Sequence, residues 1–493
     1  MPPIHNLPTE LLSEIFLYYI RACAFNGVPY EWLQLMLVCR LWKDTFKSPE
    51  FWTECAIGRN SDALLVALER SGRRMISIDG SLTWPPYTLQ TVADHVLLIQ
   101  SHQHRIRSLN LVITGVLMRT WRTQMTQLES LSLQNKPWAW ETAKLTQFLS
   151  PTLQKLELKC FTWTAVEPLL VGNLQELTLV KGSLEPIRME ELLAALAKMP
   201  SLRRLRIDWD QTDPVNDLAR VALPRLESIS GCVYQPQELY YLLFVDAPAI
   251  RHARFSFRPP VICSLQTALS CMEDILSVIA KNCDLHTARF YPPNDEELHV
   301  TFSNVLPRPE VLSKGIHLEF ATKPHQAFSI LTGEMGDLFE TIHVYEGGAV
   351  WDCADWRSVA MGHNMCNVRE LHLQGSAVKL LPYGLDHLSF SGRYPRIFES
   401  LELLSLDDPA LIPHERALDK STKTEFIHHL IESLEHHSRA HQNDPTSTIG
   451  SQFCVIFKKG WEMEAEDMEV MRGLGANVTR EVEEDSSEHA LRP

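Results

Sequence analysis

The stretch LESLSL at residues 128–133 carries the pattern that decides the fold, because its spacing of apolar residues recurs along the chain. It returns as LQKLEL at 153–158, LQELTL at 174–179 and LRRLRI at 202–207, and IRSLNL at 106–111 precedes it. Looser copies are LESI at 226–229 and IRHARF at 250–255. Successive starts are 22, 25, 21, 28, 24 and 24 residues apart, which predicts stacked structural units of similar length.

Each copy predicts a short strand, and the residues between copies predict a return segment that leads to the next strand. The return segment MEELLAALAKM at 189–199 consists of helix-forming residues with one apolar face. One such unit cannot bury its own apolar edge, so neighbouring units must stack to close a core. The motif and its period resemble leucine-rich repeats, which implies an α/β solenoid whose strands line a binding face.

Weaker copies of the pattern follow at 339–344, 368–373 and 401–406, and FCVIF at 453–457 predicts the last strand. Proline-rich breaks at 258–260, 291–293 and 306–309 interrupt this part of the chain. We expect one irregular leucine-rich-repeat-like array over 73–457, and two unrelated α+β domains divided near residue 295 are the alternative. A connecting helix is expected within 58–72, an acidic closing helix within 458–480 and a disordered acidic tail over 481–493.

The N-terminal segment 4–57 differs from the repeats and predicts three short helices. Pro8 and the acidic Glu10 suit the first turn of a helix over about 8–22. A second apolar helix is expected over about 31–39, and a third carries Trp42 and Phe46. Together with the array, these helices predict an α/β protein with a helical module at its N-terminus.

The first predicted helix has two apolar stripes, one with Leu11 and Ile15 and the other with Leu12 and Phe16. A unit of about fifty residues has too little interior to bury both stripes and the later aromatic residues. Apolar surface that such a unit cannot bury predicts contact with another protein. Each apolar side chain covered there contributes about 1.5–3 kcal/mol before the costs of association are subtracted.

Several fixed points in this segment resemble an F-box: Leu7-Pro8, Leu11-Leu12, Ile15-Phe16, Val38-Cys39-Arg40, Trp42 and the later Phe51-Trp52. That family's three-helix module binds the Skp-type adaptor of a cullin–RING ubiquitin ligase. The segment between Phe16 and Val38 is several residues longer than is common in the family. The resemblance implies that the adaptor is bound by Leu7, Pro8, Leu11, Leu12, Ile15, Phe16, Leu37, Val38, Cys39 and Trp42.

Three functions follow from this organisation. In the first, the module binds the Skp-type adaptor, and through it a cullin scaffold, while the array holds an unknown target protein. In the second, the chain is a non-catalytic repeat scaffold whose helical module only caps the array. In the third, the module binds its adaptor without a cullin and without degradation of the target.

Residues between the core leucines point to the opposite face of each predicted strand. They form a polar stripe of mixed charge that is suited to a protein partner, although a merely solvated face is the alternative. We interpret Lys155, Glu157, Lys159, Arg204, Arg206 and Asp208 as candidate target-binding residues. Further arginines at 203, 251, 254 and 258 favour an acidic or phosphorylated ligand.

The net charge bears on which partners the protein can bind, and the cysteines bear on its cellular compartment. A net charge of −15 argues against general binding to nucleic acid or to anionic membranes. The 11 cysteines are odd in number and include no CxxC pair, which favours a reduced compartment, either cytoplasm or nucleus. The first residues lack the basic and apolar regions of a secretory signal, and no apolar run reaches the length of a membrane span.

No motif for catalysis was found, so we expect a non-enzymatic protein without a cofactor or a metal. Cys39 is expected within an apolar helix, where a thiol is usually inert. His437 and His441 have a spacing that suits zinc, but no HExxH pattern or neighbouring cysteine accompanies them. We therefore interpret these histidines as part of a solvated polar helix face.

Overall fold

The computed structural model describes residues 7–25, 30–58, 61–82, 89–114, 121, 124–136, 145–180, 186–212, 218–259, 265–294, 296–304 and 314–322. Beyond these it describes 341–347, 367–373, 401–407, 453–457, 465–473 and 476–480, together with isolated residues between 327 and 432. The chain forms two compact units. Unit 1 comprises Met1–Leu226 and Phe244–Pro248, and unit 2 comprises Glu227–Leu243 and Ala249–Pro493.

Unit 1 begins with a helical module made of α1 (Thr9–Phe25), the 3-10 helix η2 (Glu31–Leu37), α2 (Arg40–Thr45) and the 3-10 helix η3 (Pro49–Trp52). Pro8 directly precedes α1, and Pro49 occupies the first position of η3, where a missing N–H costs nothing. The second element is a 3-10 helix that ends at Leu37, so it is shorter than the helix predicted over 31–39. We expected Cys39 within an apolar helix. Instead, it is exposed and has an extended backbone directly before α2.

All the strand pairs that the structure describes in unit 1 are parallel. The strands of its sheet are β1 (Glu54–Ala56), β2 (Ile76–Ser81), β3 (Ile106–Ile113), β4 (Ser130–Asn135), β5 (Lys155–Lys159), β6 (Glu176–Val180) and β7 (Arg204–Asp208), each paired with the next. The core positions of the repeated motif stand in register, so that Leu131, Leu156 and Leu177 form one buried row. The predicted strands of the motif are thus present, and the sheet is parallel because each return segment leads back to the same edge.

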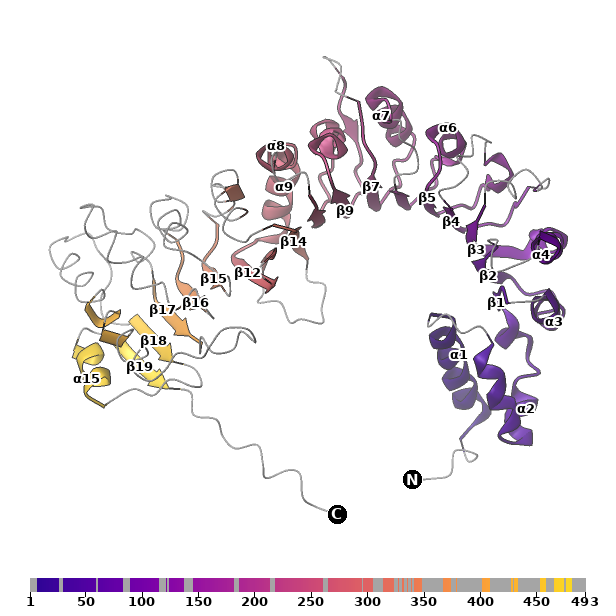
Figure 1. Cartoon of the computed structure of the whole chain (residues 1–493), viewed down its shortest axis with the longest axis horizontal. Helices are drawn as coiled ribbons and strands as arrows, with labels where there is room; N and C mark the ends of the chain where they lie inside the picture. Colours follow the sequence, from indigo (N-terminus) through magenta and orange to yellow (C-terminus); the bar gives the residue numbers. More distant parts are fainter. Residues whose placement is uncertain are drawn as a thin grey trace. The chain divides into compact units, whose positions relative to one another are not determined.

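Helices cover one side of this strand row, as Figure 1 shows for α3 (Ser61–Arg70), α4 (Leu89–Ser101), α6 (Trp163–Val166) and α7 (Met189–Ala197). Helix α7 buries Met189, Leu192 and Leu196, which recur at helical spacing, and so occupies the return segment predicted at 189–199. Short strands β8 (Val221–Ala222) and β10 (Val245–Asp246) pair in parallel beside it. The opposite side of the strand row carries the polar side chains.

The sheet of unit 2 is mostly parallel and starts with β9 (Ser228–Val233) and β11 (His252–Phe257), the looser copies of the motif. Next to β11 lies β14 (Gly315–Phe320), followed by β13 (Glu297–Ser303) and β12 (Thr287–Asn294). Strand β13 is antiparallel to both its neighbours, which the sequence did not predict. The proline pair expected to break the chain at 291–293 lies within β12, where the pairing register shifts between Tyr291 and Asn294.

Parallel pairing resumes at β15 (Val344–Gly347), β16 (Glu370–Leu373), β17 (Leu403–Leu406), β18 (Phe453–Phe457) and β19 (Ala476–Arg480). Helices η7 (Pro236–Phe244), α8 (Leu265–Ser270), α9 (Glu273–Cys283) and α15 (Ala465–Gly473) complete the principal elements of the unit. The segment 458–480 is not a helix throughout, because its end pairs with β18 as β19. Strand β18 is therefore not the last strand, as the sequence predicted.

The mixed α/β class, the N-terminal helical module and a large, mainly parallel sheet are confirmed. Among the helices that the structure describes, none has the length and apolar character needed to cross a membrane. The acidic tail at 481–493 and the histidines at 437 and 441 lie outside the described residues.

Candidate functional site

An aromatic cluster forms the interior of the N-terminal module. The Phe16 ring stacks on Phe46 with a centroid distance of 4.5 Å and meets the edge of Trp42 at 4.9 Å. Trp32 lies 5.2 Å from Phe46, so that residues of α1, η2 and α2 meet in one core. Trp52 adds a hydrogen bond from its indole Nε1 to the Phe46 carbonyl oxygen at 2.7 Å. Aromatic packing of this kind fixes how the short helices lie against one another.

The module is joined to the sheet through β1. The Tyr30 hydroxyl donates to the Ala56 carbonyl oxygen at 2.8 Å and accepts from the Ala56 N–H at 3.1 Å. Burial raises the pKa of Tyr30 well above its usual value, so the hydroxyl keeps its proton. The Arg70 guanidinium of α3 lies over the Trp52 ring, with 4.5 Å between Cζ and the ring centroid. These contacts and the β1–β2 pairing hold the module against the first part of the sheet.

Although this core is well filled, the module leaves a set of large apolar side chains in solvent. Leu11 and Ile15 on α1 are 48% and 46% exposed, whereas Leu37 and Val38 at the end of η2 are 86% and 59% exposed. Helix η2 packs against both α1 and α2, so these side chains belong to one small fold. We call Pro8, Leu11, Ile15, Tyr18, Leu37, Val38 and Leu41, all of them exposed, the apolar face of the module.

The ten predicted adaptor-binding residues differ in how far the structure exposes their side chains. Leu7 is half-buried, and six others are exposed: Pro8, Leu11, Ile15, Leu37, Val38 and Cys39. Leu12, Phe16 and Trp42 are buried in the module, so their side chains support the apolar face from inside. The division follows the helix, because Leu11 and Ile15 share one side of α1 while Leu12 and Phe16 share another.

Sequence reasoning missed two members of the apolar face, Tyr18 and Leu41. Tyr18 lies three residues after Ile15 and seven after Leu11, which places all three on one side of α1. The spacing was therefore available in the sequence, but the neighbouring Tyr19 fits the simpler four-residue series. Leu41 lies in the first turn of α2 and follows Arg40 without any comparable periodic signal.

The candidate target-binding residues lie together on the polar side of β5 and β7. Lys155 stands in register with Glu176 and Arg204, and both cations bind the Glu176 carboxylate. Burial acts to raise the pKa of Glu176, but hydrogen bonds from Arg204 and Lys155 outweigh it and bring the pKa below its usual value. Two cations thus share one carboxylate, which leaves this row with a positive excess.

The next two rows are also internally paired. Glu157 accepts from Lys159 Nζ at 2.7 Å and from Ser132 Oγ at 3.0 Å, and these bonds hold its pKa below the usual value despite burial. The Asp208 side chain is buried rather than exposed as expected, and Oδ2 accepts from Arg206 Nη2 at 2.6 Å. The six residues are therefore brought together, but most of their charge is matched within the stripe.

Metal-binding side chains do not gather in the part of the chain that the structure describes, and burial keeps one of its thiols protonated. No group of three or more His, Cys, Asp and Glu side chains there is arranged to hold a metal ion. The cysteines described are free: Cys39, Cys55, Cys160, Cys232, Cys271, Cys283 and Cys454. Burial raises the pKa of the Cys55 thiol to about 12, so this thiol stays protonated and unreactive.

Comparison with known proteins agrees with the geometry of the module. No curated protein matches the chain. The model of the F-box-like family matches residues 4–57, a range that ends directly after β1. Domains of this kind typically belong to non-catalytic adaptor subunits, and the N-terminal module of this chain is similar to them, a likeness that implies binding to a Skp-type adaptor.

Proposed function

We propose that this chain is the substrate-recognition subunit of a Skp–cullin–F-box type ubiquitin ligase. The observation that carries the proposal is the apolar face of the F-box-like domain, which remains in solvent although the domain has a filled aromatic core. Leu37, with 86% of its surface exposed, is the largest departure from ordinary apolar burial in the domain. Such a face on a small domain favours a permanent protein partner.

In this proposal the adaptor contacts Leu7, Pro8, Leu11, Ile15, Leu37, Val38 and Cys39, and Tyr18 and Leu41 extend the contact. Leu12, Phe16 and Trp42 keep the exposed residues in place without touching the adaptor, because they are buried. The buried apolar residues stabilise the folded domain. The exposed ones would contribute to association when the adaptor covers them. Through the adaptor, the chain would be linked to a cullin scaffold.

The array would hold the target protein. We infer that it is an irregular leucine-rich-repeat-like solenoid and that its polar strand face, with Lys155, Glu157, Lys159, Arg204, Arg206 and Asp208, contributes to target binding. The chain needs no catalytic group for this role, since ubiquitin transfer takes place on other subunits. Its contribution is to raise the effective concentration of target lysines near the charged conjugating enzyme.

The sharpest test compares two exposed leucines. Leu37→Asp places a charge in the apolar face, whereas Leu97→Asp places the same charge on α4, where Leu97 is 63% exposed. We expect the first variant to lose a purified Skp-type adaptor in a pull-down with full-length chain, and the second to retain it. If the wild-type chain does not bind the adaptor, or both variants bind it like wild type, the proposal fails.

The pairing of β1 with β2 favours a second candidate function, that of a scaffold in which the N-terminal domain caps the sheet. A cap protects a sheet edge, so shortening the chain to begin after β1 would expose β2 and promote aggregation. The scaffold needs the domain but no adaptor, and the pull-down separates the two. A reconstituted ubiquitination assay with a captured target then separates a cullin-linked complex from an adaptor complex without degradation.

A further inference from the structure

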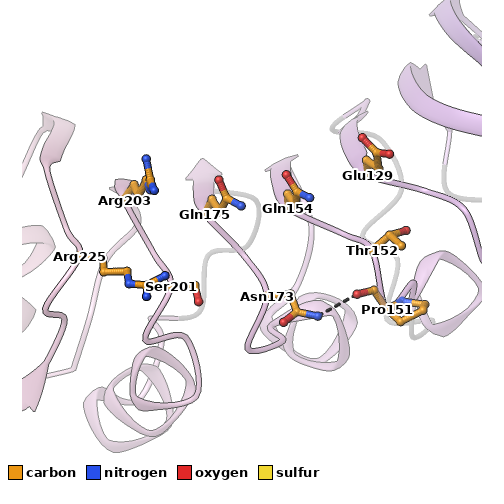
Figure 2. A pocket seen from close by; sticks show the side chains of 9 residues that line it. All are labelled: Glu129, Pro151, Thr152, Gln154, Asn173, Gln175, Ser201, Arg203 and Arg225. Atoms are coloured by element: carbon orange, nitrogen blue, oxygen red, sulfur yellow. Dashed lines mark hydrogen bonds between the residues drawn. The ribbon is translucent and has the colours of Figure 1, made fainter.

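A polar groove of about 370 Å³ crosses the start of four parallel strands in unit 1, on the rim of the sheet and apart from the polar strand face. Figure 2 shows its upper row, in which Glu129, Gln154, Gln175 and Arg203 project in the same direction from the residues just before β4, β5, β6 and β7. A lower row consists of Thr152, Pro151, Asn173, Ser201 and Arg225. The groove therefore repeats with the sheet, one position for each strand.

Backbone hydrogen bonds connect the residues of the upper row to one another. The Gln154 carbonyl oxygen accepts from the N–H groups of Gln175 and Glu176 at 2.7 and 3.0 Å, and the Gln175 carbonyl accepts from Arg203 and Arg204 in the same way. These bonds fix the Cα positions of the row. Its side chains therefore stand on a rigid support, separated by about 4.8 Å, the distance between neighbouring strands.

Within the described part of the chain, no hydrogen bond links the Gln154 or Gln175 amide to another residue. By contrast, the neighbouring Asn173 amide donates to the Pro151 carbonyl oxygen at 2.8 Å and so stiffens the floor of the groove. A glutamine amide offers both donors and an acceptor, which is the set of groups that an extended peptide backbone requires.

The two ends of the groove differ in charge. At the β4 end, the Glu129 carboxylate accepts from Arg107 Nε at 2.7 Å and is neutralised. At the β7 end lie the guanidinium groups of Arg203 and Arg225, and the Arg225 side chain is exposed and has no ion pair with any described residue. On a chain with a net charge of −15, this local cationic end favours an anionic group.

We propose that this groove binds an extended peptide segment that carries an anionic side chain. The peptide runs across the strands, with its backbone against the Gln154 and Gln175 amides and its anionic group at Arg225. Three strand spacings, about 14 Å, match about four residues of extended chain. The class of ligand follows from the groove residues alone. The further assignment of this peptide to a target protein rests on the proposed function.

The test uses the full-length chain and fluorescein-labelled pools of random octapeptides in which one central position is fixed as Glu, phosphoserine or Lys. Fluorescence anisotropy at low salt is expected to show preferential binding of the two anionic pools. Arg225→Glu should weaken that binding at least about tenfold, as loss of a charge-assisted hydrogen bond predicts. The double variant with Gln154→Ala and Gln175→Ala should weaken it about three- to tenfold.

Arg73→Glu is the matched control, since Arg73 lies exposed in the turn after α3 and the substitution changes the net charge equally. Equal weakening by Arg73→Glu and Arg225→Glu, or equal binding of the Lys and Glu pools by wild type, would overturn the proposal. If Arg225→Glu lowers the melting temperature, Arg225→Gln replaces it and is expected to weaken binding in the same direction. Unchanged binding by a correctly folded Arg225 variant also overturns the proposal.

The fixed residue separates the two sources of negative charge. Tighter binding of the phosphoserine pool assigns the Arg225 end to a phosphate, and equal binding of both anionic pools assigns it to a carboxylate. Because no adaptor is present in this measurement, its outcome is independent of the pull-down. If the chain binds the adaptor but shows no preference for the anionic pools, the proposed function stands and the groove proposal fails. If it prefers the anionic pools but does not bind the adaptor, the groove proposal stands and the proposed function fails.

Discussion

Arg105, the residue directly before β3, closes the C-terminal end of α3 by donating from Nη2 to the Leu68 carbonyl oxygen at 2.6 Å. Its Nη1 atom donates to Ser71 Oγ at 2.7 Å, and the whole residue is buried. The last carbonyl groups of a helix lack donors within the helix, so a guanidinium placed there satisfies them. One side chain thus ties the helix next to the F-box-like domain to the first long strand of the sheet.

Replacing this side chain should cost much more than replacing its near neighbour. We expect Arg105→Met to lower the free energy of unfolding by about 1.5–3 kcal/mol, because the Leu68 carbonyl and the Ser71 hydroxyl lose hydrogen bonds from a charged donor and Leu68 keeps only the bond from Ser71. Arg107→Met should change it by less than about 0.5 kcal/mol, since the Arg107–Glu129 pair lies at the surface. Urea unfolding followed by circular dichroism measures both. Similar losses for the two variants would contradict the assignment of Arg105 as a helix-closing residue.

Substitutions at two adjacent residues of α1 should affect different properties, one the stability of the domain and the other its binding of the adaptor. Phe16→Ala removes the centre of the aromatic cluster and should destabilise the F-box-like domain by about 3–5 kcal/mol. Ile15→Ala should leave stability within about 1 kcal/mol of wild type and weaken adaptor binding, because this side chain is half in solvent. Hydrogen exchange over residues 30–58 reports stability, and calorimetry with the adaptor reports binding. Wild-type binding by Ile15→Ala would remove Ile15 from the docking surface.

Gly315 at the start of β14 should not tolerate a side chain. Its φ is +140°, and an added Cβ would lie 2.1 Å from the Phe302 carbonyl oxygen on the paired strand β13. We expect Gly315→Ala to destabilise unit 2 by about 3 kcal/mol or more, through strain and loss of the β13–β14 pairing. Gly473→Ala at the end of α15 is the control, because no atom lies within 4 Å of the added Cβ. Hydrogen exchange of β13 and β14 distinguishes the two variants.

Unit 2 should lose stability in acid partly through Glu319. Hydrogen bonds from His317 and Arg254, at 3.2 and 2.7 Å, hold the pKa of this carboxyl far below its usual range despite partial burial. A pKa lower in the folded state means that the stabilisation is present above the unfolded-state pKa and is lost as the pH falls. The stability difference between wild type and Glu319→Gln should therefore shrink from about pH 6 to about pH 3. A difference that stays constant over this range would show that folding does not lower the pKa of Glu319.

The positions of the repeated strands were predictable because each depends on local spacing alone. The leucines of LxxLxL alternate with polar residues, and β3, β4, β5, β6 and β7 follow that alternation. The antiparallel insertion of β13 was not predictable, since it depends on pairing between β12 and β14 rather than on a local pattern. The residues Pro292 and Pro293 suggested a break, but a register shift accommodates them within the strand.

The candidate sites were predictable to different degrees for similar reasons. Exposure of Ile15 and burial of Phe16 depend on which side of α1 meets the aromatic cluster, and both stripes are equally apolar in the sequence. Asp208 was expected in solvent because it follows the strand alternation, yet its side chain is buried and pairs with Arg206. Gln154 and Gln175 occupy spacer positions of LxxLxL, and they become neighbours only through pairing between strands, which the local sequence does not specify.

Strand β1 has a mechanical consequence for the whole N-terminal half. Residues Glu54–Ala56 lie at the end of the F-box-like domain and also form the first strand of the parallel sheet. Ala56 hydrogen-bonds the Tyr30 hydroxyl, and the strand pairs with β2. These contacts hold the end of the domain against the first strands of unit 1. In the proposed complex, β1 would therefore connect the adaptor bound to the domain with the target bound to the strands through one continuous run of paired backbone.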